Sequence, residues 1–390
     1  MLRFLTAGES HGPGLTAILE GLPAGLPLSE ADVDAQLGRR QRGFGSGGRM
    51  RIERDQVRFA GGVLNGRTTG APVALHIDNR DWANWQDKEI QPMTIPRPGH
   101  ADLTGAIKYG YRDLRLALER ASARETAARV AVGAVCQRLL AEFGIIVGSY
   151  VVQIGSVAAD LPDDMDYAQR FALAEENDVR CPDAGRAQAM HQAIRQAMSD
   201  RDTLGGVFEV VGLGVPPGLG SHVQWDRRLD ARLMMAVGSI QAIKGVEIGP
   251  AFANAGRPGT QVHDEIWLED GRLIRRTNRA GGFEGGITTG QPVVVRAAMK
   301  PISTTLTPLR SVDLAAGEPA ETRYERSDIC AVPRAAVVGE AMVAFVLAGA
   351  LSGKLGGDSL AEMRSRFEAL RTSTLDDLEM DNEPWRFQGP

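Results

Sequence analysis

Hydrophobic and polar positions along the chain follow two different periods, which predicts a mixture of strands and helices. Short apolar runs rich in β-branched residues and bounded by Gly or Pro predict strands at 57–59, 73–77, 207–211 and 293–297. Helical spacing predicts a helix at 30–37 after the N-cap Ser29, and long helices at 123–143 and 335–351. The two long helices are rich in Ala and Val, so we expect an α+β fold in which they lie buried between sheets.

The pattern also repeats within the chain. Residues 60–73 read AGGVLNGRTTGAPV and residues 280–293 read AGGFEGGITTGQPV, identical at nine of fourteen positions without a gap. Two weaker pairs follow the same order, ERASARETAARVAVGAV with ERSDICAVPRAAVVGEA and EGLPAGL with VGLGVPPGL. This predicts two duplicated halves, about 1–150 and 200–390, packed about a pseudo-twofold axis with the more polar segment 155–200 between them.

Composition narrows the class of protein. The chain has 390 residues, 43% of them hydrophobic, and a net charge of −5, which argues against a surface built entirely for nucleic acid or an anionic membrane. Three widely spaced cysteines predict neither a disulfide framework nor a metal site. No signal peptide or segment of transmembrane length is predicted, so we expect a cytoplasmic protein without a membrane partner.

Two histidines lie in loops suited to chemistry. His11 is in TAGESHGPG and His100 is in RPGHAD, each flanked by glycine after an extended segment. Such loops expose an imidazole while holding it in place, as a general acid near neutral pH requires. Arg97, three residues before His100, could hold a charged group beside that acid. A purely structural role remains open for either histidine alone.

Candidate anion-binding groups occur at matched positions of the repeat. ERAS at 119–122 and ERSD at 325–328 each come just before a long helix, whose N-terminus favours anions. The alternative is that Ser122 and Asp328 are ordinary N-caps. KPISTT at 300–305 could hold a phosphate or could be an ordinary polar loop.

A basic glycine-rich stretch, RRQRGFGSGGRMR at 39–51, could bind a small polyanion or could bind RNA with Phe44 stacked on a base. It is a single block in an acidic chain. This favours a small polyanion.

Together these segments resemble one family, the chorismate synthases. The matching stretches are GESHG from Gly8, RRQ and GGRM within 39–50, RPGHAD from Arg97, KYG from Lys108, SARETAARVA from Ser122, DTLGG from Asp202, QAIKGVEIG from Gln241, TNRAGG from Thr277, GQPV from Gly290, KPIST from Lys300, RSD from Arg326 and GGDS from Gly356. Their number and common order make coincidence a poor explanation.

The resemblance implies a trans-1,4-elimination of phosphate from 5-enolpyruvylshikimate 3-phosphate to give chorismate, the last step of the shikimate pathway. It implies dependence on reduced FMN supplied by a separate flavin reductase, and a homotetramer. The implied fold is a β-α-β sandwich of two pseudo-symmetric halves forming one domain over 1–390. The alternative is an anion-binding or RNA-binding protein on the same scaffold without activity.

The resemblance also implies roles for residues. His11 would protonate the departing phosphate, His100 would keep a proton near flavin N1, and Asp328 would tune or deprotonate flavin N5, which removes the proton at C6. The substrate-binding residues would be Arg40, Arg49, Arg97, Ser122, Arg124 and Arg326. The flavin contacts would be Arg120, Ala121, Ser122, Gln241, Ala242, Gly285, Lys300, Pro301, Ile302, Ser303, Thr304 and Arg326.

One position departs from the family pattern. Ser46 stands where the family usually has an arginine, and Phe44 stands where Tyr is common. The family's arginines at the positions of Arg40 and Ser46 are associated with NADP contact. Loss of one charge-assisted bond costs about 1.5 to 3 kcal/mol. We therefore expect weaker anion and NADPH binding at this loop, with Arg42 as the substitute cation.

Overall fold

The computed structural model describes residues 2–46, 54–162, 164–325 and 327–387. Its α-helices are α1 Glu30–Gln41, α2 Asp102–Tyr109, α3 Arg115–Ala121, α4 Thr126–Ala141, α5 Tyr167–Glu175, α6 Ala184–Ser199, α7 Leu229–Gly238, α8 Ala251–Ala255, α9 Val332–Leu355 and α10 Leu360–Glu368. Its longer strands are β1 Arg3–Ala7, β2 Gly14–Glu20, β3 Val57–Gly61, β6 Val73–Asp78, β7 Ile146–Ile154, β9 Gly206–Leu213, β10 Ile243–Ile248, β11 Ile266–Glu269, β12 Arg272–Arg275, β15 Val293–Met299, β16 Arg310–Asp313 and β17 Glu318–Glu321. The short strands are β4 Val63–Leu64, β5 Arg67–Thr68, β8 Val157–Ala158, β13 Phe283–Glu284 and β14 Ile287–Thr288.

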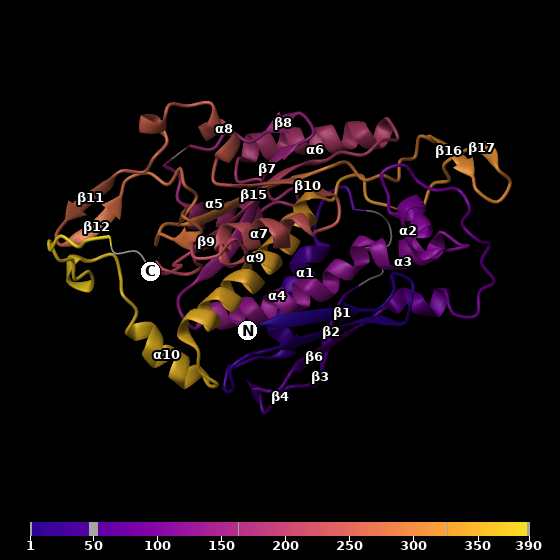
Figure 1. The fold of residues 1–390 in the computed structure, drawn as a ribbon. Helices are drawn as coiled ribbons and strands as arrows, with labels where there is room; N and C mark the ends of the chain where they lie inside the picture. The colour runs from indigo at the N-terminus through magenta and orange to yellow at the C-terminus, as the bar shows by residue number, and fades with distance from the viewer. Residues whose placement is uncertain (1, 47–53, 163, 326, 388–390) are drawn as a thin grey trace.

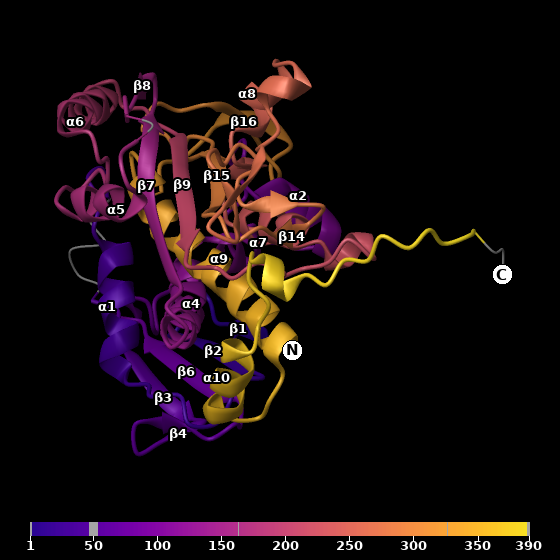
Figure 2. The same ribbon diagram turned by 90° about the vertical axis from the view of Figure 1, so that its left-hand side faces the viewer.

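Two antiparallel sheets lie on opposite sides of a layer of helices, as Figures 1 and 2 show. One sheet has the order β1-β2-β6-β3 and the other the order β10-β15-β9-β7-β8. Helix α4 packs on β2 and β6, helix α9 packs on β7 and β9, and the two helices pack on each other. The fold is therefore α+β with its long helices inside, as their Ala and Val content predicts.

The two halves have matching connections. In each, a strand leads through a turn to a helix, α1 or α7, and a small hairpin precedes a second long strand, β6 or β15. Thr68 accepts a hydrogen bond from the backbone N–H of Leu26 and donates one to the carbonyl of Pro23. Thr288 makes the same pair of bonds with Leu219 and Pro216. The first threonine of the repeated TTG motif thus makes equivalent hydrogen bonds in both halves.

Helix α9 is longer than the sequence predicts. It runs over 24 residues with a mean hydropathy of 1.9 in its most apolar window, which is long and apolar enough to cross a membrane. The expectation that no segment reaches that length was therefore wrong. In the fold, 78% of this window is buried against α4, β7 and β9, as in the core helix of a soluble protein.

The starts of the long helices also differ from the expectation. The chain forms a short 3-10 turn, η3 Ala123–Glu125, before α4 begins at Thr126, and Ser122 caps that turn by accepting from the backbone N–H of Arg124. Helix α9 has Ala331 as its N-cap, without a side-chain hydrogen bond. Asp328 is therefore not the N-cap of α9, and its carboxylate accepts a hydrogen bond from Arg334.

Candidate active site

His11 is held by a carboxylate from another element. The turn after β1 carries His11, and Glu119 of α3 accepts hydrogen bonds from its backbone N–H at 2.7 Å and its Nδ1 at 2.8 Å. Burial opposes the charge of Glu119, but the bonds from His11 lower the pKa of this carboxyl overall. The ring centroid of Trp85 lies 4.2 Å from that of His11. The imidazole is thus fixed by a hydrogen bond at Nδ1 and covered by an indole.

His100 has the same arrangement in its own loop. Its Nδ1 lies 2.6 Å from Oδ1 of Asp102, the first residue of α2, whose side chain is fully buried. Arg97 donates to both oxygens of Asp102, through Nε at 2.8 Å and Nη2 at 3.0 Å, and donates from Nη1 to Thr304. Burial alone would raise the pKa of Asp102, but the bonds from His100 and Arg97 hold it well below its usual range.

Two predicted arginines share one buried acid. Arg124 donates from Nη1 to both oxygens of Asp55, at 2.7 and 2.8 Å, and Arg40 donates to Asp55 at 3.2 Å. Arg40 also donates to the hydroxyl of Thr126 and the carbonyl of Ala123, at the start of α4. All of these charged groups are buried. Among the described residues, Asp55 thus brings two guanidinium groups together, and guanidinium groups suit the carboxylates and phosphate of an anionic substrate.

Asp328 lies between Arg334 and the glycine-rich loop. Its Oδ2 accepts a hydrogen bond from Arg334 of α9. The next residue, Ile329, donates its backbone N–H to the carbonyl of Gly45 at 2.8 Å, and Ser327 donates its hydroxyl to the carbonyl of Thr304 at 2.9 Å. The neighbours of Asp328, Ser327 and Ile329, therefore join the KPIST segment to the loop 42–46.

Three of the predicted flavin contacts, Gln241, Ala242 and Lys300, lie just before β10 and just after β15. The carbonyl of Ala242, which has a φ of 67°, accepts from the backbone N–H of Lys300 at 2.9 Å. Gln241 donates from Nε2 to Glu125 at 3.2 Å, while its buried Oε1 has no hydrogen-bond partner among the described residues. Burial and the neighbouring charge of Lys244 lower the pKa of Lys300. A buried acceptor and two adjacent cations fit a ligand that has both N–H groups and a phosphate.

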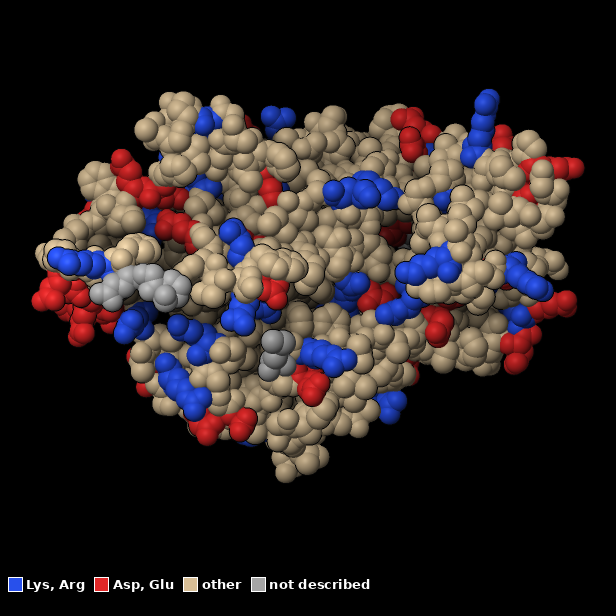
Figure 3. Space-filling view, in the orientation of Figure 1, with Lys and Arg blue, Asp and Glu red and all other residues tan. Residues whose placement is uncertain are grey.

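Two further contacts bring some of these groups close together. A Cβ placed on Gly99, next to His100, would lie 3.4 Å from Cβ of Ser303 and 3.7 Å from Nζ of Lys300. On the other side, the hydroxyl of Ser10 donates to that of Ser122 at 3.0 Å. In Figure 3, Lys and Arg side chains surround a hollow beside the region of α2 and α3, with acidic atoms inside it.

The other predicted residues have different surroundings. Gly285 is in the turn between β13 and β14, where an added Cβ would meet His222, and the described hydrogen bonds of that turn do not reach the histidine loops. Arg120 lies beside the His11 loop, donating to the backbone carbonyl and the hydroxyl of Thr6 and to the carbonyl of Gly8. Arg49 and Arg326 lie outside the described residues.

The described part of the glycine-rich stretch, residues 39–46, is held by contacts with α5 and α6. The ring of Phe44 lies 4.2 Å from that of His191 on α6, so it is packed against protein where an RNA base would need it free. Arg42 donates to Glu175 at 3.1 Å, and the hydroxyl of Ser46 donates to the carbonyl of Gly43 at 2.6 Å. In this structure Arg42 thus already pairs with an acid, so serving as a substitute cation would require it to break that bond.

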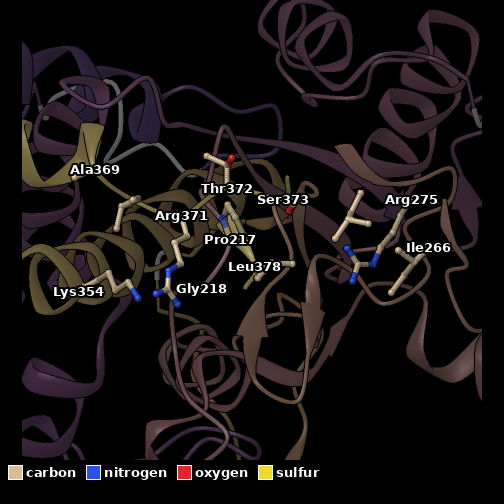
Figure 4. A pocket seen from close by; sticks show the side chains of 12 residues that line it. Pro217, Gly218, Ile266, Arg275, Lys354, Ala369, Arg371, Thr372, Ser373 and Leu378 are labelled. Atoms are coloured by element: carbon tan, nitrogen blue, oxygen red, sulfur yellow. The ribbon is translucent and has the colours of Figure 1, made fainter. Parts of the chain in front are cut away.

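A separate cavity of about 520 Å³ lies between the β11–β12 hairpin and the segment 369–378 that follows α10 (Figure 4). Lys354, Arg371 and apolar side chains such as Ile266 and Leu378 line it. Neither a histidine nor a carboxylate does, so it lacks the proton-transfer groups that the histidine loops have.

Three acids of the site were missed by the sequence analysis. Asp102 follows His100 by two residues, a spacing that could have indicated a partner for the ring. Glu119 opens the repeated ERxS/ERxD segment, but nothing in the sequence links it to His11, 108 residues away. Asp55 follows a basic stretch, and only the fold brings Arg40 and Arg124 to it.

Comparison with known proteins gives the family. The sequence model described as "Chorismate synthase" matches residues 2–351. The chain belongs to the chorismate synthase family. It is therefore a lyase of the shikimate pathway that acts on a phosphate ester.

Similar chorismate synthases come from diverse organisms. The one of Aquifex aeolicus is 56% identical, over 94% of this chain and 96% of its own, and that of Trichlorobacter lovleyi is 57% identical, over 93% and 97%. A crystal structure of a chorismate synthase superposes with a TM-score of 0.79 at 49% identity, covering 94% of this chain and 96% of the other. The likeness extends over nearly the whole chain, so it includes every described loop of the site.

Proposed function

We propose that this chain makes chorismate by trans-1,4-elimination of phosphate from 5-enolpyruvylshikimate 3-phosphate, in the site that contains His11, His100 and Asp328. The observation that carries the proposal is the pair of histidines, each with a carboxylate at Nδ1, on loops joined to a set of buried arginines. An acid beside cations is what loss of a phosphate leaving group requires.

The chain's residues divide the reaction between them. Arg40, Arg97 and Arg124 hold the phosphate and carboxylates of the substrate, with Ser122 in support. As the carbon–oxygen bond breaks, its electron pair goes to the phosphate oxygen, and His11 delivers a proton there from Nε2 because its Nδ1 faces Glu119. C6 loses a proton in the same reaction, and the electron pair of that C–H bond enters the new double bond.

Reduced FMN fits the other side of the site. The residues that would hold it are Gln241, Ala242, Lys300 to Thr304 and the segment 120–122. Gly285 lies apart from them in this structure. When bound, reduced FMN supplies an electron-rich ring and a basic N5 for the C6 proton. His100 would hold a proton beside N1, and Asp328 would hold or accept one beside N5.

The proposal extends to the finer features of the family. The matched threonine bonds and matched strand order support a sandwich of two pseudo-symmetric halves within a single domain. We further infer a cytoplasmic homotetramer that receives reduced FMN from a separate flavin reductase, and weak direct use of NADPH because Ser46 bonds to its own loop.

The test is an anaerobic assay with the substrate and with FMN that is either reduced by dithionite or left oxidised. Phosphate and chorismate should appear together in equal amounts, and only with reduced FMN. His11→Asn, His100→Asn and Asp328→Asn should each lower kcat by about 10²- to 10⁴-fold, the usual contribution of a positioned acid or base. Binding of both ligands without turnover of the wild-type chain would refute the proposal.

A further inference from the structure

Glu119 makes three hydrogen bonds with the His11 loop. Its two carboxylate oxygens accept from the backbone N–H and from Nδ1 of His11, and its own carbonyl accepts the backbone N–H of Ser10 at 2.9 Å. One residue of α3 therefore sets both the path of the loop and the orientation of the ring.

The charge of Glu119 decides what the ring can do. Its pKa is lowered because the bonds from His11 and the charge of Arg115 outweigh the effect of burial, so it is a carboxylate at neutral pH. A carboxylate only accepts hydrogen bonds, so the Nδ1 that faces it must carry a proton. Nε2 is then the nitrogen through which His11 exchanges a proton with a ligand.

Trp85 restrains the same ring from its face. Its indole lies 4.2 Å from the imidazole, centroid to centroid, and its Nε1 donates to the buried carboxylate of Asp81 at 2.9 Å. The indole is therefore fixed, and it limits both rotation of His11 and access of water to that face.

The second histidine gives an internal comparison. His100 faces Asp102 with the same ring nitrogen, at 2.6 Å, although the carboxylate comes from α2 and lies two residues along the chain. Nη2 of Arg97 also lies 3.1 Å from that Nδ1, so the two imidazoles share a carboxylate at Nδ1 but differ in their other neighbours. This is the pattern of a ring whose tautomer matters, because a carboxylate on one nitrogen determines the role of the other.

We propose that Glu119 is the positioning residue of His11: it keeps the proton on Nδ1 and presents Nε2 to the phosphate leaving group. The proposal rests on the role of His11 under the proposed function. It also assigns Glu119 a part in catalysis without contact to substrate.

The direct test is nitrogen NMR of the protein labelled with ¹⁵N-histidine, with His11→Asn used to assign the ring. In the wild-type chain, neutral His11 should be protonated on Nδ1. In Glu119→Ala the Nε2–H tautomer should become the major one, whereas Glu119→Gln should keep the Nδ1 proton because its amide oxygen still accepts. A wild-type ring protonated on Nε2, or an unchanged tautomer in Glu119→Ala, would overturn the proposal.

Kinetics give the second readout. Glu119→Ala should lower kcat by roughly 10- to 100-fold, the usual effect of removing the partner of a functional imidazole, and should change KM less than threefold. Glu119→Gln should recover part of the loss. Glu89→Gln, the same substitution at an exposed acid of the neighbouring segment, should behave as wild type. A rise in KM as large as the fall in kcat, with no recovery in Glu119→Gln, would indicate a merely structural role.

The two arms separate this inference from the proposed function. If the wild-type chain makes no chorismate but the tautomer changes as described, the reaction assigned to the site is wrong and the positioning stands. If chorismate forms but the tautomer of His11 does not change in Glu119→Ala, the positioning role of Glu119 is wrong. Glu119→Gln is close to isosteric, so it keeps the test valid should the Ala variant fail to fold.

Discussion

At the scale of the residue, one buried carboxylate pairs with two buried arginines. Asp55 faces both Arg40 and Arg124, and all three side chains are at least nine-tenths buried. Taking charges out of water is costly, and the cost is recovered only while every partner is present. A site that holds two guanidinium groups for an anion therefore depends on one carboxylate between them.

Removing that carboxylate should be severe. We expect Asp55→Asn to lower the free energy of unfolding by about 3–5 kcal/mol, because two buried cations lose a carboxylate that they share. Urea unfolding measures the loss. Asp78→Asn changes the same residue type where the side chain is 78% exposed and pairs with His76, so it should cost little. A cost below about 1 kcal/mol for Asp55→Asn would contradict the role of this carboxylate.

At the scale of the element, the crossing of α4 and α9 depends on a glycine. A Cβ on Gly133 would lie 2.2 Å from Cβ of Ala341 and 2.3 Å from its Cα, so the two backbones approach as closely as glycine permits. The sequence predicts both helices from their periodicity. Their contact could not be predicted, because it depends on which faces meet after folding.

Gly133→Ala should therefore destabilise the protein by about 1–3 kcal/mol or more, the cost of overpacking a core. Gly353→Ala is the matched control within α9, since nothing lies within 4 Å of its added Cβ. That variant should gain roughly 0.5–1 kcal/mol from helix propensity. Thermal unfolding of the two variants compares them, and equal effects would show that the helices can move apart freely.

A second element-scale feature ties α1 to α5 and α9. Arg39 donates to the fully buried Glu340 of α9 and to Glu175 of α5, and Arg180 donates to both acids. Burial opposes the charge of Glu175, yet the bonds from Arg39 and Arg180 lower its pKa to about 2. The end of α1, which carries Arg40, is thereby fixed from two sides.

This shift predicts an acid dependence of stability. A carboxyl with a lowered folded-state pKa stabilises fully above its unfolded value, here 4.5, and the contribution disappears as pH falls toward about 2. The wild-type chain should thus be more stable than Glu175→Gln at pH 6, and the difference should shrink between pH 4.5 and 2. Denaturant unfolding across this range measures it. A difference that stays constant with pH would rule out this charge as the cause.

At the scale of the whole molecule, the repeat is visible as two sets of equivalent bonds. The buried hydroxyls of Thr68 and Thr288 each join a leucine N–H to a proline carbonyl in their own half. The sequence repeat predicted related segments. It could not predict that each would close a turn onto its own hairpin.

Equivalent bonds should have equivalent energies. Thr68→Val and Thr288→Val should each cost about 1–3 kcal/mol, because two buried backbone groups lose a partner, and the double variant should cost their sum. Thr69→Val, at an exposed neighbour, is the control. Urea unfolding measures all four proteins. A large cost in one half alone would show that the halves differ in how they use the motif.

The sequence by itself determined the α+β class, the buried Ala- and Val-rich helices, the internal repeat and the histidines, because periodicity, composition and glycine-flanked loops are local properties. Only the tertiary structure decided which carboxylate faces which base or cation: Glu119 with His11, Asp55 with Arg40 and Arg124, Asp328 with Arg334 and not as a helix cap. These pairings join segments that are up to 108 residues apart, and the energy of a charge pair depends on distance and burial, neither of which is written in local sequence.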